Sequence, residues 1–142
     1  LCYACELGVH EIIDIATLTG ACMVALGSAA SGIMGNDDEF VKDIIKSGEY
    51  VGEKFWQLPM WQEYRDNLKS DVADMRNTGA RYGGASSAGI FLKEFVSDDI
   101  RWAHLDVAGT AFLEKPSKEF SKGASGVGLR TILNYLLSFN LS

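Results

Sequence analysis

The chain has 142 residues, with 13 basic and 19 acidic side chains and a formal net charge of −6 at pH 7. This acidic balance argues against a basic nucleic-acid-binding surface and against a polybasic membrane patch. Hydrophobic residues make up 47% of the chain and charged residues 23%, which is typical of one globular domain rather than a disordered segment. No apolar run reaches the roughly 18–20 residues that a membrane-spanning helix needs.

The chain begins without an initiator methionine, and its first eight residues are typical of the end of a helix that Gly8 stops. We therefore expect a preceding segment to be missing. The three cysteines form no obvious disulfide framework, which favours reduced thiols and a cytoplasmic location. Cys2 and Cys5 have the spacing of a redox or zinc pair, but a second ligand pair is lacking and Cys22 is alone. They are better interpreted as small apolar residues on one helix face.

Short β-rich runs then alternate with helical periods, which predicts a layered α/β fold. Residues 11–16 form a short, largely apolar strand typical of a buried parallel sheet, and residues 31–35 form another. Residues 21–26 lie between them with helical character. Asn36 is the predicted N-cap of the next helix, with Glu39 as its capping-box partner, and Gly48 is predicted to end that helix.

The second half of the chain continues the alternation. We expect, in order, an extended stretch at 55–61, a short helix at 62–68, a long loop at 70–85, a helix over 88–96, a strand at 102–109, a polar loop at 115–126 and a final helix over 129–137. The long loop is of a length that is usually functional in a compact domain.

Both of the best predicted strands contain the same short pattern. The first carries Asp14-Ile15-Ala16 before Thr17-Leu18-Thr19-Gly20, and the second carries Asp106-Val107-Ala108 before Gly109-Thr110-Ala111. Ligands of open α/β sheets bind beyond the carboxyl ends of parallel strands, where small residues let a substrate approach the backbone. A tight turn that needs small residues only for packing explains the pattern equally well.

Other polar residues favour structural roles. His104 lies on an apolar strand and is better explained as a hydrogen-bonded core residue than as a ligand. The glycine-rich segment at 81–87 precedes a helix, but it lacks the Lys-Ser/Thr of a phosphate-binding loop, so a plain cap is favoured over nucleotide binding. The charged residues between 71 and 77 are typical of a surface network.

Taken together, the segments resemble the leucine (cytosol) aminopeptidase family, whose members remove N-terminal residues from peptides with two metal ions. The matching segments, in the family's order, are residues 1–4 (LCYA), 14–21 (DIATLTGA), 25–27 (ALG), 56–59 (WQLP), 73–77 (ADMRN), 91–96 (FLKEFV) and 102–109 (WAHLDVAG). The resemblance implies a mixed, largely parallel sheet flanked by helices, as in the C-terminal portion of a zinc-aminopeptidase-like catalytic domain.

The resemblance also accounts for the abrupt start. In the family, the segment that precedes Leu1 carries metal-binding carboxylates and an arginine that acts through a bound bicarbonate, and further lysines and aspartates lie upstream. Residues 1–142 are thus expected to be a partial catalytic domain that lacks its metal-binding segment. The two divalent metal ions, zinc or manganese, would have their ligands upstream of Leu1, so we expect neither catalytic residues nor metal ligands in this chain.

What the resemblance assigns to this chain is a substrate wall formed by Thr17, Leu18, Thr19, Gly20, Ala108 and Ala111. By resemblance, the Leu18 carbonyl and the Gly20 amide pair with the peptide backbone, and Thr17, Gly20, Ala108 and Ala111 line the pocket for the N-terminal side chain. Some relatives have methionine at the position of Ala111, so alanine would widen this pocket. Residues 70–85 would border the leaving-group side.

The family resemblance implies a cytoplasmic homo-hexamer that acts on peptides. The acidic charge balance and the lack of a long apolar run argue against a nucleic-acid or membrane partner for this part. The 142 residues alone are expected to be catalytically inert. The alternative is an inert homologue or fragment that serves as an oligomerisation or binding module. The upstream segment discriminates between the two, since only a peptidase needs the metal-binding carboxylates there.

Overall fold

A computed structural model describes residues 1–79, 81–116 and 121–139. The elements follow the order α1 (Cys2–Glu6), β1 (Glu11–Ala16), α2 (Gly20–Leu26), β2 (Ser31–Gly35), α3 (Asp38–Tyr50), β3 (Phe55–Gln57), α4 (Gln62–Arg65), the 3₁₀ turn η1 (Asp66–Leu68), α5 (Gly84–Lys93), β4 (Arg101–Asp106), β5 (Phe112–Leu113), β6 (Gly123–Ala124) and α6 (Leu129–Ser138). Each helix and strand expected from the sequence is present, but some ends differ: α5 begins four residues before the predicted 88 and ends three before 96, β4 ends three before 109, and only 55–57 of the extended stretch at 55–61 is a strand. The predicted polar loop at 115–126 contains β6 and lies partly outside the described residues.

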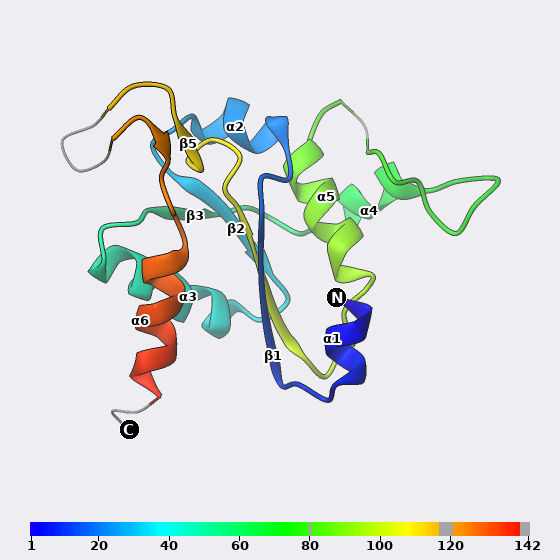
Figure 1. Ribbon diagram of the computed structural model, residues 1–142. Helices are drawn as coiled ribbons and strands as arrows, with labels where there is room; N and C mark the ends of the chain where they lie inside the picture. The colour runs from blue at the N-terminus through cyan, green and yellow to red at the C-terminus, as the bar shows by residue number, and fades with distance from the viewer. Residues whose placement is uncertain (80, 117–120, 140–142) are drawn as a thin grey trace.

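The main sheet has four strands in the order β1-β4-β2-β3 (Figure 1). β1 pairs with β4 and β2 pairs with β3 in parallel, whereas β2 and β4 are antiparallel. The predicted mixed, largely parallel sheet flanked by helices is therefore confirmed. β5 and β6 form a separate two-stranded ribbon between the end of β4 and α6.

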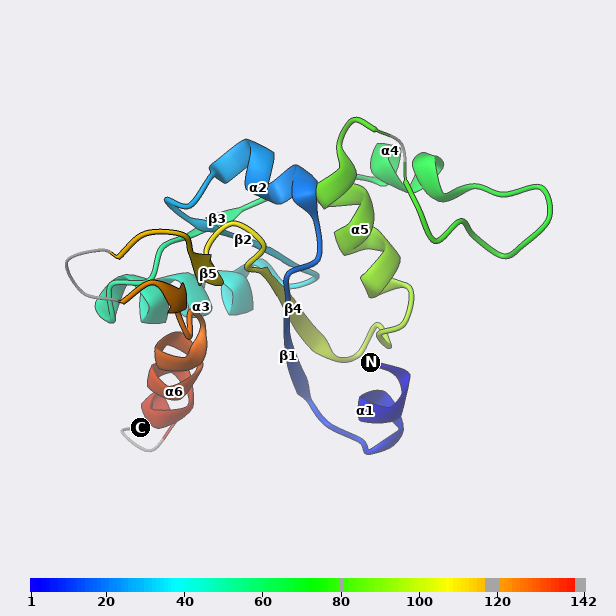
Figure 2. The same ribbon diagram turned by 45° about the horizontal axis from the view of Figure 1, so that its top comes forward.

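Helices cover both faces of the sheet (Figures 1 and 2). On one face, α3 and α6 pack over the largest core cluster, which includes Ile33, Phe40, Ile44 and Leu105, all of them fully buried. On the other face, α1 and α5 lie over a second cluster that contains the fully buried Trp102. Successive residues of a strand face opposite sides, so the alternate residues of β4 divide between these two layers.

The ends of α3 differ from the prediction. Asp37, not Asn36, is the N-cap, because its carboxylate accepts a hydrogen bond from the Phe40 amide at 2.7 Å. The Asn36 side chain is instead used by β4, where it accepts from the Trp102 amide and donates to the Ile100 carbonyl. Gly48 does not end the helix, which runs on to Tyr50.

Gly48 has a packing role. A Cβ built at this position would lie 2.7 Å from the Glu53 carbonyl oxygen and 2.7 Å from the Phe55 ring, so only glycine allows β3 to approach α3 this closely. The chain turns away at Gly52, whose φ of +78° lies in the left-handed region. Gly52 therefore supplies the stop that the sequence suggested for Gly48.

The final helix, α6, is held by a buried acidic residue from elsewhere in the chain. Glu53 is 5% exposed, and its Oε2 accepts hydrogen bonds from the Gly128 and Thr131 amides and from the Thr131 hydroxyl. Arg130 donates to the other carboxylate oxygen at 3.2 Å. A carboxylate at a helix N-terminus satisfies amides that have no partner within the helix and interacts favourably with the helix dipole.

The apolar face of α6 that the sequence singled out points mainly outward. The exposed fractions of Leu129, Leu133, Leu136 and Leu137 lie between 51% and 70%, and Thr131 and Tyr135 are the buried residues of the helix. Among the helices in the described part of the chain, none has the length and apolar character required to cross a bilayer.

Candidate functional site

The parallel pairing of β1 with β4 brings the two Asp-containing strand ends together. Asp14 is aligned with His104, and Ala16 is aligned with Asp106, so the segments after both strands leave the sheet side by side. The first segment, residues 17–19, leads into α2, and the second, residues 107–111, leads into β5. The predicted site residues Thr17, Leu18, Thr19, Ala108 and Ala111 belong to these two segments, and Gly20 is the first residue of α2.

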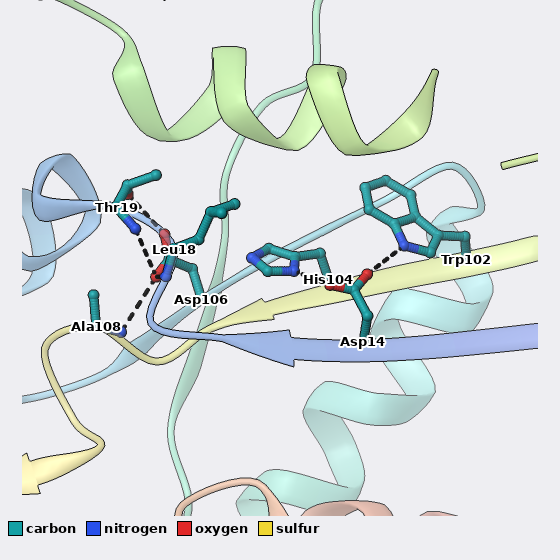
Figure 3. A network of polar contacts seen from close by, with 7 residues as sticks. All are labelled: Asp14, Leu18, Thr19, Trp102, His104, Asp106 and Ala108. Carbon is teal, nitrogen blue, oxygen red and sulfur yellow. Dashed lines mark hydrogen bonds and ion pairs between the residues drawn. The ribbon is translucent and has the colours of Figure 1, made fainter. Parts of the chain in front are cut away.

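The Asp106 carboxylate joins the two segments (Figure 3). Its Oδ1 accepts hydrogen bonds from the Leu18 amide at 3.2 Å and the Thr19 amide at 3.4 Å on one side, and from the Ala108 amide at 3.2 Å on the other. Its Oδ2 accepts from the Thr19 hydroxyl at 2.7 Å. Asp106 is fully buried, so four donors compensate a carboxylate that water does not reach.

Thr19 links this carboxylate to α2. Its side chain is the N-cap of the helix, since its hydroxyl oxygen accepts from the Cys22 amide at 3.0 Å while its hydroxyl hydrogen goes to Asp106. A threonine at this position thus satisfies one of the free amides at the start of the helix. The loop from Thr17 to Gly20 is therefore fixed at both ends, by the sheet and by the helix.

Several backbone groups of this loop have no hydrogen-bond partner in the part of the chain that the structure describes. Among the described residues, neither the Leu18 carbonyl nor the Gly20 amide makes a hydrogen bond, whereas the Leu18 and Thr19 amides both point to Asp106. Leu18 and Gly20 are exposed, and a Cβ built at Gly20 would meet nothing within 4 Å. An acceptor and a donor are thus presented to open space two residues apart.

Two hollows border the segments of the candidate site. One, of about 360 Å³, is lined by Leu18, Thr19, residues 77–79 of the long loop, and apolar residues of α5 such as Phe91. The other, of about 780 Å³, is lined by Met23, Ala108, Gly109 and residues 112–115. Of the residues expected to form one wall, Leu18 and Thr19 line the first hollow and Ala108 lines the second, whereas Thr17, Gly20 and Ala111 line neither of the two.

The remaining predicted site residues lie nearby. Thr17 is exposed and lies between the end of β1 and the Leu18 and Thr19 amides that donate to Asp106. The Ala111 amide donates to the Val107 carbonyl at 2.9 Å, and the Ala111 side chain is partly buried against the core cluster under α3 and α6. Gly109 approaches the end of α2 so closely that a Cβ would lie 2.0 Å from the Gly27 carbonyl oxygen. This contact holds the second segment against α2.

A second polar cluster lies on the same face of the sheet, further from the strand ends (Figure 3). Asp14 accepts from the Trp102 indole at 2.6 Å and contacts His104 Nδ1 at 2.5 Å. His104 is fully buried, and its Nε2 has no hydrogen-bond partner in the described structure. The interpretation of His104 as a hydrogen-bonded core residue is confirmed.

The thiols are free where the structure describes them, and Cys2 and Cys5 lie on the short helix α1. Cys22 is buried, and burial together with the nearby charge of Asp106 raises the pKa of its thiol. Across residues 1–79, 81–116 and 121–139, no three histidine, cysteine or acidic side chains gather closely enough to hold a metal ion. These residues therefore do not fit a two-metal centre.

Sequence reasoning missed the residues that organise the site. Asp106 was noticed only as part of a repeated strand-end pattern, and its contacts across 87 and 88 positions of sequence could not be read from spacing. The signal available was the pattern itself, since an acidic residue that ends a buried strand needs hydrogen-bond donors from whatever lies beside it. Glu53 gave no comparable signal.

The fold and the site define a mixed α/β protein with a candidate binding site at the carboxyl ends of two parallel strands. Residues 1–133 match the catalytic domain of the cytosol aminopeptidase family. The chain therefore belongs to this family, which confirms the resemblance seen in the sequence.

Individual relatives agree with this assignment. A probable cytosol aminopeptidase from Geobacter sulfurreducens is 52% identical over 136 residues, which cover 96% of this chain and 27% of that protein. The corresponding protein of a Picosynechococcus species is 49% identical over 138 residues, covering 97% of this chain and 28% of that protein. The structure of a mutant tomato leucine aminopeptidase superposes with a TM-score of 0.89 at 45% identity, over 97% of this chain and 26% of that one. This chain thus spans about a quarter of the length of its relatives.

Proposed function

We propose that this chain is the substrate-binding part of a metal-dependent aminopeptidase that releases N-terminal, leucine-like residues from peptides. The observation that carries the proposal is the unpaired Leu18 carbonyl and Gly20 amide at the strand ends. A peptide unit offers a donor and an acceptor of its own, so an extended substrate can satisfy both groups as a strand would. The family membership supports the same activity.

In this proposal the loop from Thr17 to Gly20 forms the wall along which the peptide lies. We assign the pocket for the N-terminal side chain to Thr17, Gly20, Ala108 and Ala111 from the family resemblance; Ala108 lines the larger hollow, and the small Ala111 would leave room for a large side chain. The hollow between Leu18 and residues 77–79 receives the leaving-group side. Its lining by Phe91, Leu92 and Ala88 favours apolar residues there.

The reaction itself needs groups that the described part of this chain does not gather. Two divalent metal ions, zinc or manganese, held with a bicarbonate by residues outside this chain, would polarise the scissile carbonyl and activate water. This chain's contribution is orientation. Holding a peptide by two backbone hydrogen bonds removes rotational freedom that would otherwise oppose the reaction, and this effect is large in enzymes.

The complete enzyme is proposed to be a cytoplasmic homo-hexamer that acts on peptides. The net charge of −6 supports the absence of nucleic acid among the partners of this part. A second candidate function, an inert oligomerisation or binding module, is favoured by one observation. The leucines on α6 present an apolar face to solvent, which is typical of a contact surface.

The experiment that tests the proposal compares two proteins. The first is the 142-residue chain, and the second is a chimera in which this chain replaces the matching quarter of the Geobacter sulfurreducens relative. We expect the chimera, loaded with zinc or manganese, to release leucine from leucyl peptides, and the short chain to release none. A folded, metal-loaded chimera without activity would refute the peptidase proposal and favour the binding module. Leucine release by the short chain would refute the assignment of the chemistry to the missing segment.

A further inference from the structure

Asp106 occupies an unusual place in the proposed substrate wall. It is fully buried, yet the four hydrogen bonds of its carboxylate go to the exposed or partly exposed segments that border the site. Two of these bonds use the amides of Leu18 and Thr19, which point inward to the carboxylate. The Leu18 carbonyl and the Thr19 amide belong to the same trans peptide group and point in opposite directions, so the bond from the Thr19 amide to Asp106 leaves the Leu18 carbonyl facing away from Asp106, where it has no partner among the described residues.

The same carboxylate also sets the position of the second segment. Its Oδ1 accepts from the Ala108 amide, two residues further along its own chain, and so fixes the turn at which β4 leaves the sheet. One oxygen atom therefore has hydrogen bonds to both segments of the site, residues 17–19 and residues 107–111. A shift of this oxygen would move Leu18 and Ala108 relative to each other.

We infer that Asp106 is a positioning residue that fixes the orientation in which the Leu18 carbonyl and the Gly20 amide meet a peptide. It touches no substrate and acts only through the two segments. This inference rests on the proposed function, because it assigns to Asp106 the geometry of that same wall. It predicts that the loss of Asp106 weakens the recognition of a continuing peptide backbone more than it weakens the hydrolysis of a substrate that has none.

The test compares two substrates in the chimera described above. Leucinamide ends at the bond to be cleaved, whereas leucyl-glycyl-glycine continues with peptide units that can pair with Leu18 and Gly20. In Asp106→Asn the side chain keeps its shape, but an NH₂ donor replaces one of the two acceptor oxygens, so the four donors can no longer all be satisfied. We expect the ratio of kcat/KM for the tripeptide to that for leucinamide to fall about ten- to a hundredfold, mainly through KM.

Three further variants separate positioning from general damage. Asp14→Asn changes another carboxylate on the same face of the sheet. The Asp14 carboxylate contacts Trp102 and His104 but neither segment of the site. The substitution should leave the substrate ratio unchanged even where it lowers stability. Thr19→Val removes the hydroxyl that Asp106 accepts from and should lower the ratio, whereas Thr19→Ser keeps the hydroxyl and should restore it.

Amide hydrogen exchange in the 142-residue chain tests the hydrogen bonds to Asp106 without an activity assay. The amides of Leu18, Thr19 and Ala108 should exchange more slowly than that of Gly20, and Asp106→Asn should remove this difference. Equal exchange of the four amides in the unmodified chain would overturn the inference. So would an equal loss of activity on both substrates in Asp106→Asn. An inactive chimera in which the amide pattern holds would refute the proposed function alone.

Discussion

Replacing Glu53 should weaken the whole α6 side of the molecule, because this residue caps a helix from a distant place in the chain. Its carboxylate is the partner of the Gly128 and Thr131 amides and of the Thr131 hydroxyl, at 3.0, 3.2 and 2.6 Å. In Glu53→Ala these buried donors lose their acceptor, and each unsatisfied buried group costs about 1–3 kcal/mol. The ion pair with Arg130 adds little, since the arginine side chain is 45% exposed.

We therefore expect Glu53→Ala to lower the free energy of unfolding by about 3–5 kcal/mol, the lower part of the sum for three buried donors at about 1–3 kcal/mol each. Glu53→Gln keeps an acceptor and loses the charge, so its cost should be smaller, about 1–2 kcal/mol. Urea unfolding followed by tryptophan fluorescence and circular dichroism gives both values by linear extrapolation. The slope against urea should remain that of the unmodified protein.

Glu49→Ala is the matched control, since Glu49 is an exposed acidic residue of the last turn of α3. Its effect should stay within about 0.5 kcal/mol. A cost below about 1 kcal/mol for Glu53→Ala would refute the reasoning, because it would mean that water reaches the start of α6 and replaces the carboxylate. An effect equal to that of Glu49→Ala would lead to the same conclusion.

Three further outcomes are expected. Burial raises the pKa of the Tyr135 phenol, so the folded state holds this proton more tightly than the unfolded state, and stability should fall as the pH rises above about 10. In a tyrosinate absorbance titration, one of the five tyrosines should therefore ionise only on unfolding. Ionisation of all five tyrosines in the folded protein would contradict this. Burial also raises the pKa of the Cys22 thiol, so a thiol reagent should modify the exposed Cys2 at least about ten times faster than it modifies Cys22. Peptide mapping by mass spectrometry would measure the two rates, and equal rates would exclude a buried Cys22. Gly109→Ala forces a Cβ against the Gly27 carbonyl and should lower the free energy of unfolding in urea by about 1–3 kcal/mol. An unchanged free energy would show that the segment around Gly109 can move freely away from the end of α2.

The strands and helices could be predicted from the sequence because each has a local pattern of its own. The helix ends were less predictable, since a cap depends on which side chain is free to serve. Asn36 has the right chemistry for an N-cap, but the strand next to it uses both ends of its amide, and the adjacent Asp37 takes the position. Likewise, Gly48 lacks a side chain because β3 packs closely against α3 at this position, and not because the helix ends there.

The helix α6 shows a second limit of sequence patterns. The leucine spacing predicted the helix, yet spacing identifies an apolar face without saying what covers it. The face that meets the core carries Thr131 and Tyr135, which are held by the carboxylates of Glu53 and Glu11. Contacts with these distant carboxylates could not be inferred from the period of the helix.

The candidate site makes the same point with two residues that look alike in the sequence. Asp14 and Asp106 both precede a β-branched residue and an alanine, yet Asp14 lies two residues before the end of β1, whereas Asp106 is the last residue of β4. In the parallel register Asp14 therefore lies beside His104, within the sheet, and Asp106 lies beside Ala16, where the chain of β1 turns out toward Leu18. The first carboxylate can reach only side chains of the sheet, and the second reaches free backbone amides. A difference of two positions in register thus separates a carboxylate that fixes the core from one that shapes the edge where a peptide would bind.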